Sequence, residues 1–146
     1  MAFERHERTF LESSRVARLA SIGPAGIPHA VPICFALDGT TLASALDEKP
    51  KTVAQSNLQR VRNIRSNPAV SVLIDRYTER WDDLAWVRID GQATLVMPGS
   101  DGHRRAVCAL RDKYDQYATH AIDDYPVIAI TPDKVVSWGA LEVRGD

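Results

Sequence analysis

The residues of this chain best suited to chemistry are the lysines and arginines between positions 49 and 65. They are Lys49, Lys51, Arg60, Arg62 and Arg65, and no acidic residue occurs from position 49 to position 67. Lysine and arginine donate several hydrogen bonds from a positive charge, so they are frequent ligands of phosphate groups. This segment therefore indicates a phosphate site, although a basic helix face turned toward water has the same composition.

A strand that precedes the basic segment has one bulky and one small face. Successive side chains of a strand point to opposite faces, so every second residue shares a face. The bulky face carries Val31, Ile33, Phe35 and Leu37, and the small face carries Ala30, Pro32, Cys34 and Ala36. A small face lets a flat object come close to the backbone, either a partner sheet or a planar ligand. Together with the basic segment, it predicts a site for a planar, phosphorylated cofactor.

Apolar periodicity and turn residues divide the chain into the elements that must position these side chains. Asp38-Gly39 is a two-residue hairpin signal, and Asn67-Pro68 ends a helix because the residue before proline disfavours the α region. Gly91, in the longest strand, predicts a bulge or bend. The expected helices cover residues 3–14, 50–66 and 101–118. The expected strands cover 16–22, 29–38, 40–46, 69–75, 84–96, 126–130 and 134–138, with 131–133 as a turn. This order predicts a mainly β, α+β barrel.

The bulk composition indicates one globular domain spanning residues 1–146. A chain of 146 residues, of which 45% are hydrophobic, is long enough to bury a core. A formal net charge of −1 gives no overall electrostatic reason to bind nucleic acid or a membrane surface. No apolar run approaches the roughly 20 residues of a membrane span. The first ten residues lack the apolar core of a signal peptide, so a cytoplasmic location is expected.

The cysteines and histidines do not form a recognisable metal or catalytic motif. Cys34 and Cys108 are too few for a disulfide framework or a metal cluster, and the four histidines are not at metal-ligand spacing. His29 is the histidine nearest the proposed site, and we interpret it first as a polar residue at a strand end. We therefore expect no metal and no catalytic side chain.

Three consecutive features resemble the pyridoxamine-phosphate-oxidase-like split β-barrel superfamily. They are the hairpin VPICFALDGTTL, the basic helix, and the segment RVRNIRSNPAVSVLID. Members of this superfamily bind FMN or the deazaflavin coenzyme F-420, and the chain is most similar to the short actinobacterial branch of F-420-dependent oxidoreductases. The resemblance covers nearly the whole chain. It implies a six- to seven-stranded antiparallel split β-barrel with three peripheral helices, assembled as a homodimer with cofactor sites at the subunit interface.

The resemblance also implies which residues hold the cofactor phosphate. In the family, a basic residue about two turns before the Asn-Pro stop contacts this phosphate, and here that residue is Arg60. Lys49 and Lys51, at the start of the basic segment, are expected to add positive charge to the same site.

The flavin ring of family members lies along the backbone of two strands. In this chain the corresponding residues are Pro32, Ile33, Cys34 and Phe35, with Ser44 and Ala45 opposite them. Trp138 corresponds to the tryptophan that approaches the flavin across the dimer. Trp86 and Arg88 decorate the outer face of the longest strand and serve either the subunit interface, which we favour, or the ligand.

These features predict an oxidoreductase in which the cofactor performs the chemistry and the protein orients it. Hydride passes between coenzyme F-420, or alternatively FMN, and a planar small molecule. Coenzyme F-420 is favoured because its oligoglutamate tail needs positive charge. A true pyridoxamine-phosphate oxidase is a poorer match because the chain ends in LEVRGD, without the histidine of the family's Arg-and-His substrate motif. The alternatives are a non-catalytic carrier or sensor with the same pocket, and a dimeric scaffold with an empty pocket.

Overall fold

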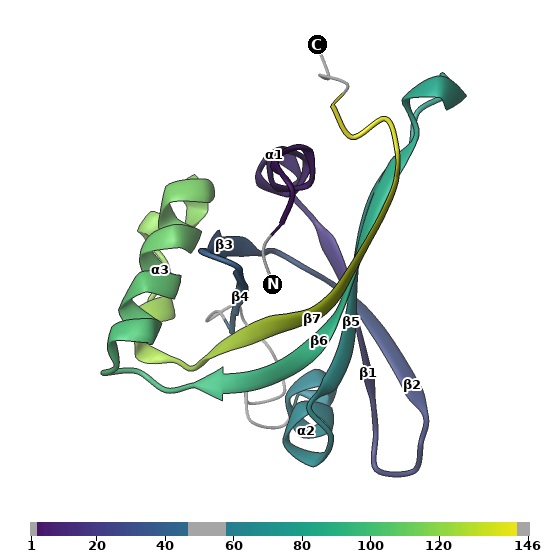
Figure 1. Cartoon of the computed structure of the whole chain (residues 1–146). Coiled ribbons are helices and arrows are strands. Elements are labelled where there is room, and N and C mark those ends of the chain that lie inside the picture. The colour runs from purple at the N-terminus through teal and green to yellow at the C-terminus, as the bar shows by residue number, and fades with distance from the viewer. Residues whose placement is uncertain (1–2, 47–57, 143–146) are drawn as a thin grey trace.

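The computed structural model describes residues 3–46 and 58–142, which fold into one antiparallel sheet with helices around it (Figure 1). Seven strands and three α-helices lie in this part of the chain, as the sequence predicts, and they confirm the mainly β, α+β split barrel. None of these helices is long and apolar enough to cross a membrane. The elements are α1 (Arg5–Ser13), β1 (Ala17–Ile22), β2 (Pro28–Ile33), β3 (Ala36–Asp38), β4 (Thr41–Ala45), α2 (Gln59–Ser66), β5 (Ala69–Arg76), β6 (Ala85–Val96), α3 (Asp101–Lys113) and β7 (Val127–Gly139).

The strand order explains why the sheet closes into a barrel. The order is β2-β1-β5-β6-β7-β4-β3, so the two edge strands are consecutive in the chain. Only Cys34 and Phe35 separate β2 from β3. Three Cα steps span at most about 11 Å, so the sheet must curl until its two edges lie side by side. The prediction of one strand over residues 29–38 is therefore wrong: the chain changes partner at this corner, from β1 to β4.

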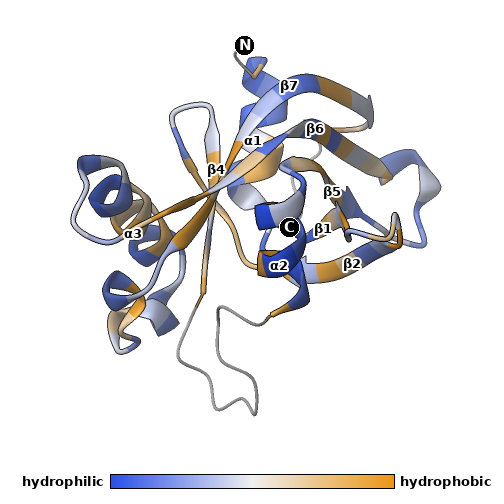
Figure 2. Ribbon diagram, turned by 90° about the horizontal axis from the view of Figure 1, so that it is seen from below, coloured by the Kyte–Doolittle hydropathy of each residue, from blue (hydrophilic) through white to orange (hydrophobic). Residues whose placement is uncertain are grey.

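Two apolar clusters fill the structure. The larger lies inside the barrel against α1 and α2, and includes Leu19, Phe35 and Ile89. The smaller joins α3 to β3 and β4. Strand β4, coloured mostly as hydrophobic in Figure 2, serves both clusters, because Leu42 belongs to the larger and Ala43 to the smaller. The two clusters fix the position of the corner between β2 and β3 from both sides.

Strand β7 is continuous where two strands with a turn between them were predicted. The register between β6 and β7 shifts after Asp90, which pairs with Lys134, while Gly91 pairs with Pro132. Asp133 is therefore the extra residue of a bulge, which confirms the irregularity predicted at Gly91. A bulge tolerates proline within a strand because the ladder is already interrupted there.

Helix α2 is fastened to the sheet through one buried amide side chain. Asn63 is fully buried, and its Nδ2 donates to Ser21 Oγ on β1 at 3.0 Å. Its Oδ1 accepts from Gln59 Nε2 at 2.6 Å. The helix begins at Gln59, because Leu58 has extended backbone angles (φ −61°, ψ 138°) and forms the N-cap. A single helix running from position 50 is therefore wrong, and the predicted start at Pro50 lies outside the described residues.

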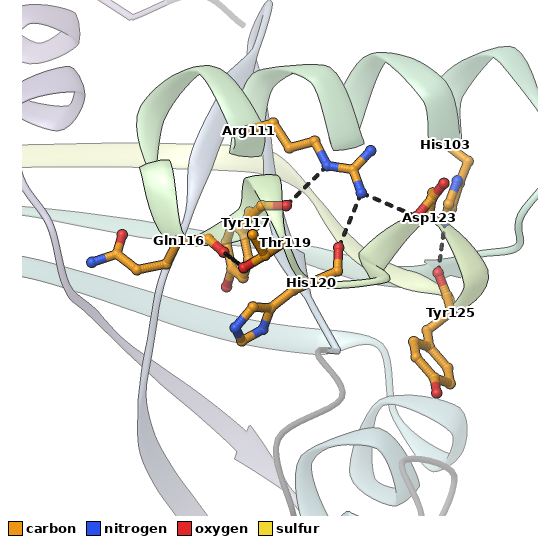
Figure 3. A network of polar contacts seen from close by, with 8 residues as sticks. All are labelled: His103, Arg111, Gln116, Tyr117, Thr119, His120, Asp123 and Tyr125. Atoms are coloured by element: carbon orange, nitrogen blue, oxygen red, sulfur yellow. Dashed lines mark hydrogen bonds and ion pairs between the residues drawn. The ribbon is translucent and has the colours of Figure 1, made fainter.

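Helix α3 ends at Lys113 rather than at residue 118, because Arg111 holds the following chain in short 3₁₀ turns (Figure 3). Its guanidinium donates to the carbonyls of Tyr117 (3.1 Å) and His120 (3.0 Å) and pairs with Asp123 at 3.1 Å. A hydrogen bond from its own backbone, and then the one from Arg111, lower the pKa of Asp123. Arg111 thus holds the segment that follows α3 against this helix.

Candidate functional site

The residues predicted to carry the flavin ring lie at the corner between β2 and β3. Pro32 is exposed on the outer face of β2, Cys34 is half-buried, and Ile33 and Phe35 point into the core. Ser44 and Ala45 are buried in β4, which pairs with β3 and β7. Ala36 lies opposite Ala43, so the β3–β4 register, continued by one residue, brings Ser44 opposite Phe35. The structure thus brings the two predicted segments together at the corner.

The predicted phosphate residues are only partly described. Arg60 is half-buried on α2, whereas Arg62 and Arg65 are exposed. This difference follows from the apolar stripe of the helix, in which Val61 and Ile64 are buried. Lys49 and Lys51 lie outside the described residues. Arg60 is therefore the arginine of this helix that lies closest to the barrel interior.

Trp138 lies at the far end of β7, on the outer face of the sheet. It is 52% exposed and pairs in register with Trp86 on β6. A row of register partners runs across this face from β2 to β7: Pro32, Arg18, Leu73, Arg88 and Val136. Register partners point to the same side of a sheet, so Pro32 and Trp138 share one outer face.

The corner is held by a residue whose role the sequence did not reveal. The Tyr114 hydroxyl accepts the backbone N–H of Phe35 at 3.1 Å. It also lies 2.7 Å from the carbonyl oxygen of Arg15 and 3.0 Å from that of Phe35, either of which can accept its proton. Burial raises the pKa of Tyr114, so the hydroxyl keeps this proton at neutral pH. Tyr114 and Phe35 are 79 positions apart in the chain, so no local pattern of residues indicates that they meet.

Lys113, next to Tyr114, covers the same corner. Its Nζ donates to the carbonyl oxygen of Leu11 at 3.2 Å and lies 3.7 Å from the centre of the Phe35 ring. Burial, and then the charge of Arg15, lower the pKa of Lys113 to about 8. The amine is therefore held charged at neutral pH in a place that disfavours the charge. Among the described residues, no group of three His, Cys, Asp or Glu side chains is placed to hold a metal ion.

Replacing Lys113 by methionine is expected to remove a pH dependence of stability. The pKa of Lys113 is lower in the folded state than in the unfolded state, so between about pH 8 and pH 10.5 the unfolded chain binds the extra proton. The free energy of unfolding of the wild-type protein should then rise with pH across this window, relative to the variant. Urea unfolding at pH 7, 8, 9 and 10 measures the difference. A difference that stays constant or falls with pH would contradict the lowered pKa.

Residues 3–139 match the family described as pyridoxamine 5'-phosphate oxidase, and the chain belongs to this family. A curated relative, the 5a,11a-dehydrotetracycline/5a,11a-dehydrooxytetracycline reductase of Streptomyces rimosus, is 26% identical over 149 residues, covering 100% of this chain and 87% of the relative. The family and this relative make the chain an oxidoreductase-like protein of the split-barrel type.

Three solved structures share the fold. Protein Rv2991 of Mycobacterium tuberculosis has a TM-score of 0.76 at 22% identity and covers 95% of this chain and 86% of its own. The heme storage protein HutZ of Vibrio cholerae has a TM-score of 0.71 at 14% identity, with 95% of each chain covered. An F-420 reductase has a TM-score of 0.62 at 22% identity and covers 88% of this chain and 94% of its own. At these identities the likeness shows the fold.

Proposed function

We propose that this protein is an oxidoreductase that binds coenzyme F-420, with FMN as the alternative, and transfers hydride between this cofactor and a planar small molecule. The observation that carries the proposal is a small, exposed platform on the outer face of the first hairpin. Ala30 and Pro32 on β2 and Ala20 on β1 are exposed there, and Ala20 pairs with Ala30. A flat ring can approach the backbone closely over such small side chains.

The strand order supports the same use of β2. As an edge strand it pairs only with β1, so part of its backbone N–H and C=O groups point away from the sheet. These groups can hydrogen-bond to the polar edge of a ring. The N–H of Phe35 is already used by Tyr114, so the ring is expected to use the backbone before Phe35. When bound, the cofactor supplies the hydride chemistry, and the residues of this chain bind and orient it.

We favour coenzyme F-420 over FMN because α2 and the segment before it are positively charged. Helix α2 contains Arg60, Arg62 and Arg65 and no acidic residue. Lys49 and Lys51 precede it, outside the described residues. This cationic region suits the phosphate and the oligoglutamate tail of F-420, whereas FMN brings a phosphate alone.

Replacing Arg60 by alanine is expected to weaken F-420 binding several-fold to a hundredfold, since a charged hydrogen bond contributes about 1–3 kcal/mol. Fluorescence titration of purified protein with F-420, and in parallel with FMN, measures the dissociation constants. Arg62→Ala is the matched control, because Arg62 is exposed on the same helix, and it should change the constant less than threefold. Equal dissociation constants for the wild type and Arg60→Ala would show that Arg60 does not bind the cofactor.

The outer face of the sheet also supports a homodimer. It exposes Leu73 (38%) and Trp138 (52%) beside Trp86 and Arg88. Aromatic residues and arginine are enriched at interfaces, and twofold dimers are the commonest oligomers. We propose that two copies bury this face and complete the cofactor site between them. Sedimentation equilibrium at micromolar concentration tests this, and a monomer would contradict it.

The second candidate function is a non-catalytic carrier or sensor with the same pocket. The similarity of the fold to that of a heme storage protein supports this alternative. The two functions differ in turnover. Protein with pre-reduced F-420 should reduce a planar unsaturated acceptor, such as a quinone or a polycyclic enone, faster than free reduced F-420 does. Tight cofactor binding without any such acceleration would support the carrier.

A further inference from the structure

A hollow of about 1060 Å³ lies beside α1. Its walls are one side of α1, the segment between α1 and β1 with the start of β1, the end of β5, and Leu141 and Glu142 in the turn after β7. Figure 1 shows α1 and the last described residues of the chain near each other at the same end of the barrel. Ligand pockets commonly have volumes of about 300–1,000 Å³, so the hollow is large enough for a ligand of several fused rings.

The charge of the hollow favours an anion. Four arginines line it, against two acidic residues, Asp75 and Glu142. Arg18 pairs with Asp75 at 3.0 Å, which neutralises that pair. Arg5 and Arg15 form no ion pair within the described part of the chain; Arg15 donates instead to the carbonyl oxygen of Lys113 at 2.7 Å. With four arginines against two carboxylates, the lining carries two more positive than negative charges.

The lining also contains apolar side chains. Tyr77 is 63% exposed and Val16 is 42% exposed, and both line the hollow together with the side chain of Phe10. Aromatic and aliphatic surface of this kind binds flat apolar rings. The combination of exposed ring surface with arginine is suited to an aromatic or conjugated molecule that carries a negative charge.

The hollow adjoins the proposed ring platform. Arg18, in its wall, is the register partner of Pro32, and Cα atoms of such partners are about 4.5–5.5 Å apart. The carbonyl of Arg15 lies 2.7 Å from the Tyr114 hydroxyl, which holds the corner at Phe35. A second hollow, of about 440 Å³, contains Trp138 and shares His6, Leu141 and Glu142 with the first. The two hollows therefore adjoin each other beside α1, and the second extends the space to Trp138.

We propose that this hollow is the acceptor site and that it takes a planar, anionic molecule, either a polycyclic enolate or an aromatic carboxylate, with Arg5 binding the negative charge. The inference rests on the proposed function, because it names the substrate class of the same site. The acceptor would lie beside the ring platform, with its charged end at the first turn of α1.

The test is a fluorescence titration of the whole protein, without cofactor, with 1-hydroxy-2-naphthoate. Arg5→Glu should weaken binding at least tenfold, and the helix should keep its fold because an acidic residue suits its first turn. Arg80→Glu is the matched control: Arg80 is 84% exposed, lies outside the hollow, and should change the dissociation constant less than twofold. Thr9→Trp, an exposed position of α1 that lines the hollow, should weaken binding by occupying part of it.

Equal binding of naphthoate by the wild type and both hollow variants would overturn the proposal, as would wild-type protein that does not bind it. Cofactor titration separates this failure from failure of the proposed function. If F-420 and FMN both fail to bind while naphthoate binds through Arg5, the oxidoreductase proposal falls and the anion site stands. If F-420 binds equally to wild type and Arg5→Glu, a raised acceptor KM in the variant supports the acceptor site, and an unchanged KM overturns it.

Discussion

Replacing Gly91 by alanine is expected to destabilise the protein by about 3 kcal/mol or more, a large share of the stability of a typical domain. Gly91 is buried at the bulge between β6 and β7, opposite Pro132. A Cβ atom added there would overlap the carbonyl of Thr131 and lie 3.2 Å from the Cα of Pro132. Both neighbours are backbone atoms, so the methyl group can be accommodated only by separating the two longest strands. Urea unfolding followed by tryptophan fluorescence measures the loss.

Gly102→Ala is the matched control for this effect. Gly102 lies in α3, and an added Cβ there would meet only the end of the flexible Arg105 side chain, at 3.7 Å. Alanine should stabilise the helix by about 0.5–1 kcal/mol, because glycine loses more backbone entropy on folding. The same substitution is thus expected to have opposite signs at the two positions. A Gly91→Ala protein as stable as the wild type would mean that β6 and β7 do not pack as described.

The bulge shows what the sequence could and could not predict about the fold. A glycine within a long apolar strand is a local signal, and the predicted irregularity at Gly91 is confirmed. Thr131-Pro132-Asp133 is also a local signal, and it predicted a turn. The turn is absent because Pro132 pairs with Gly91, a residue 41 positions earlier whose missing side chain makes room for it. The outcome depends on the partner strand, and local residue types carry no information about that partner.

In the candidate site, too, some features could be predicted from local sequence and others could not. Strand alternation predicted that Pro32 lies on the small, open face of its strand, and in the structure Pro32 is exposed. The break at Cys34 and Phe35 was not predictable, because the residues there alternate as in one strand. Its cause is the hydroxyl of Tyr114, which takes a backbone group that a continuous strand would place in the ladder.

Replacing Tyr114 by phenylalanine is expected to destabilise the protein by about 2–4 kcal/mol and to weaken cofactor binding about tenfold. The change removes only the hydroxyl oxygen, but it leaves the buried N–H of Phe35 and the carbonyl of Arg15 without this partner. Each polar group left unsatisfied in a buried place costs about 1–3 kcal/mol. The corner then loses its anchor, and the backbone that is proposed to face the ring becomes less well positioned.

Three measurements test this role of Tyr114. Urea unfolding gives the loss of stability, titration with F-420 gives the dissociation constant, and hydrogen exchange reports directly on the Phe35 amide. Exchange at Phe35 should accelerate in Tyr114→Phe, whereas Tyr125→Phe should change stability by less than about 0.5 kcal/mol. Tyr125 is a suitable control because it is half-buried and its hydroxyl makes no hydrogen bond within the described residues. If the Phe35 amide stays as protected in Tyr114→Phe as in the wild type, another group holds the corner, and Tyr114 packs there only through its ring.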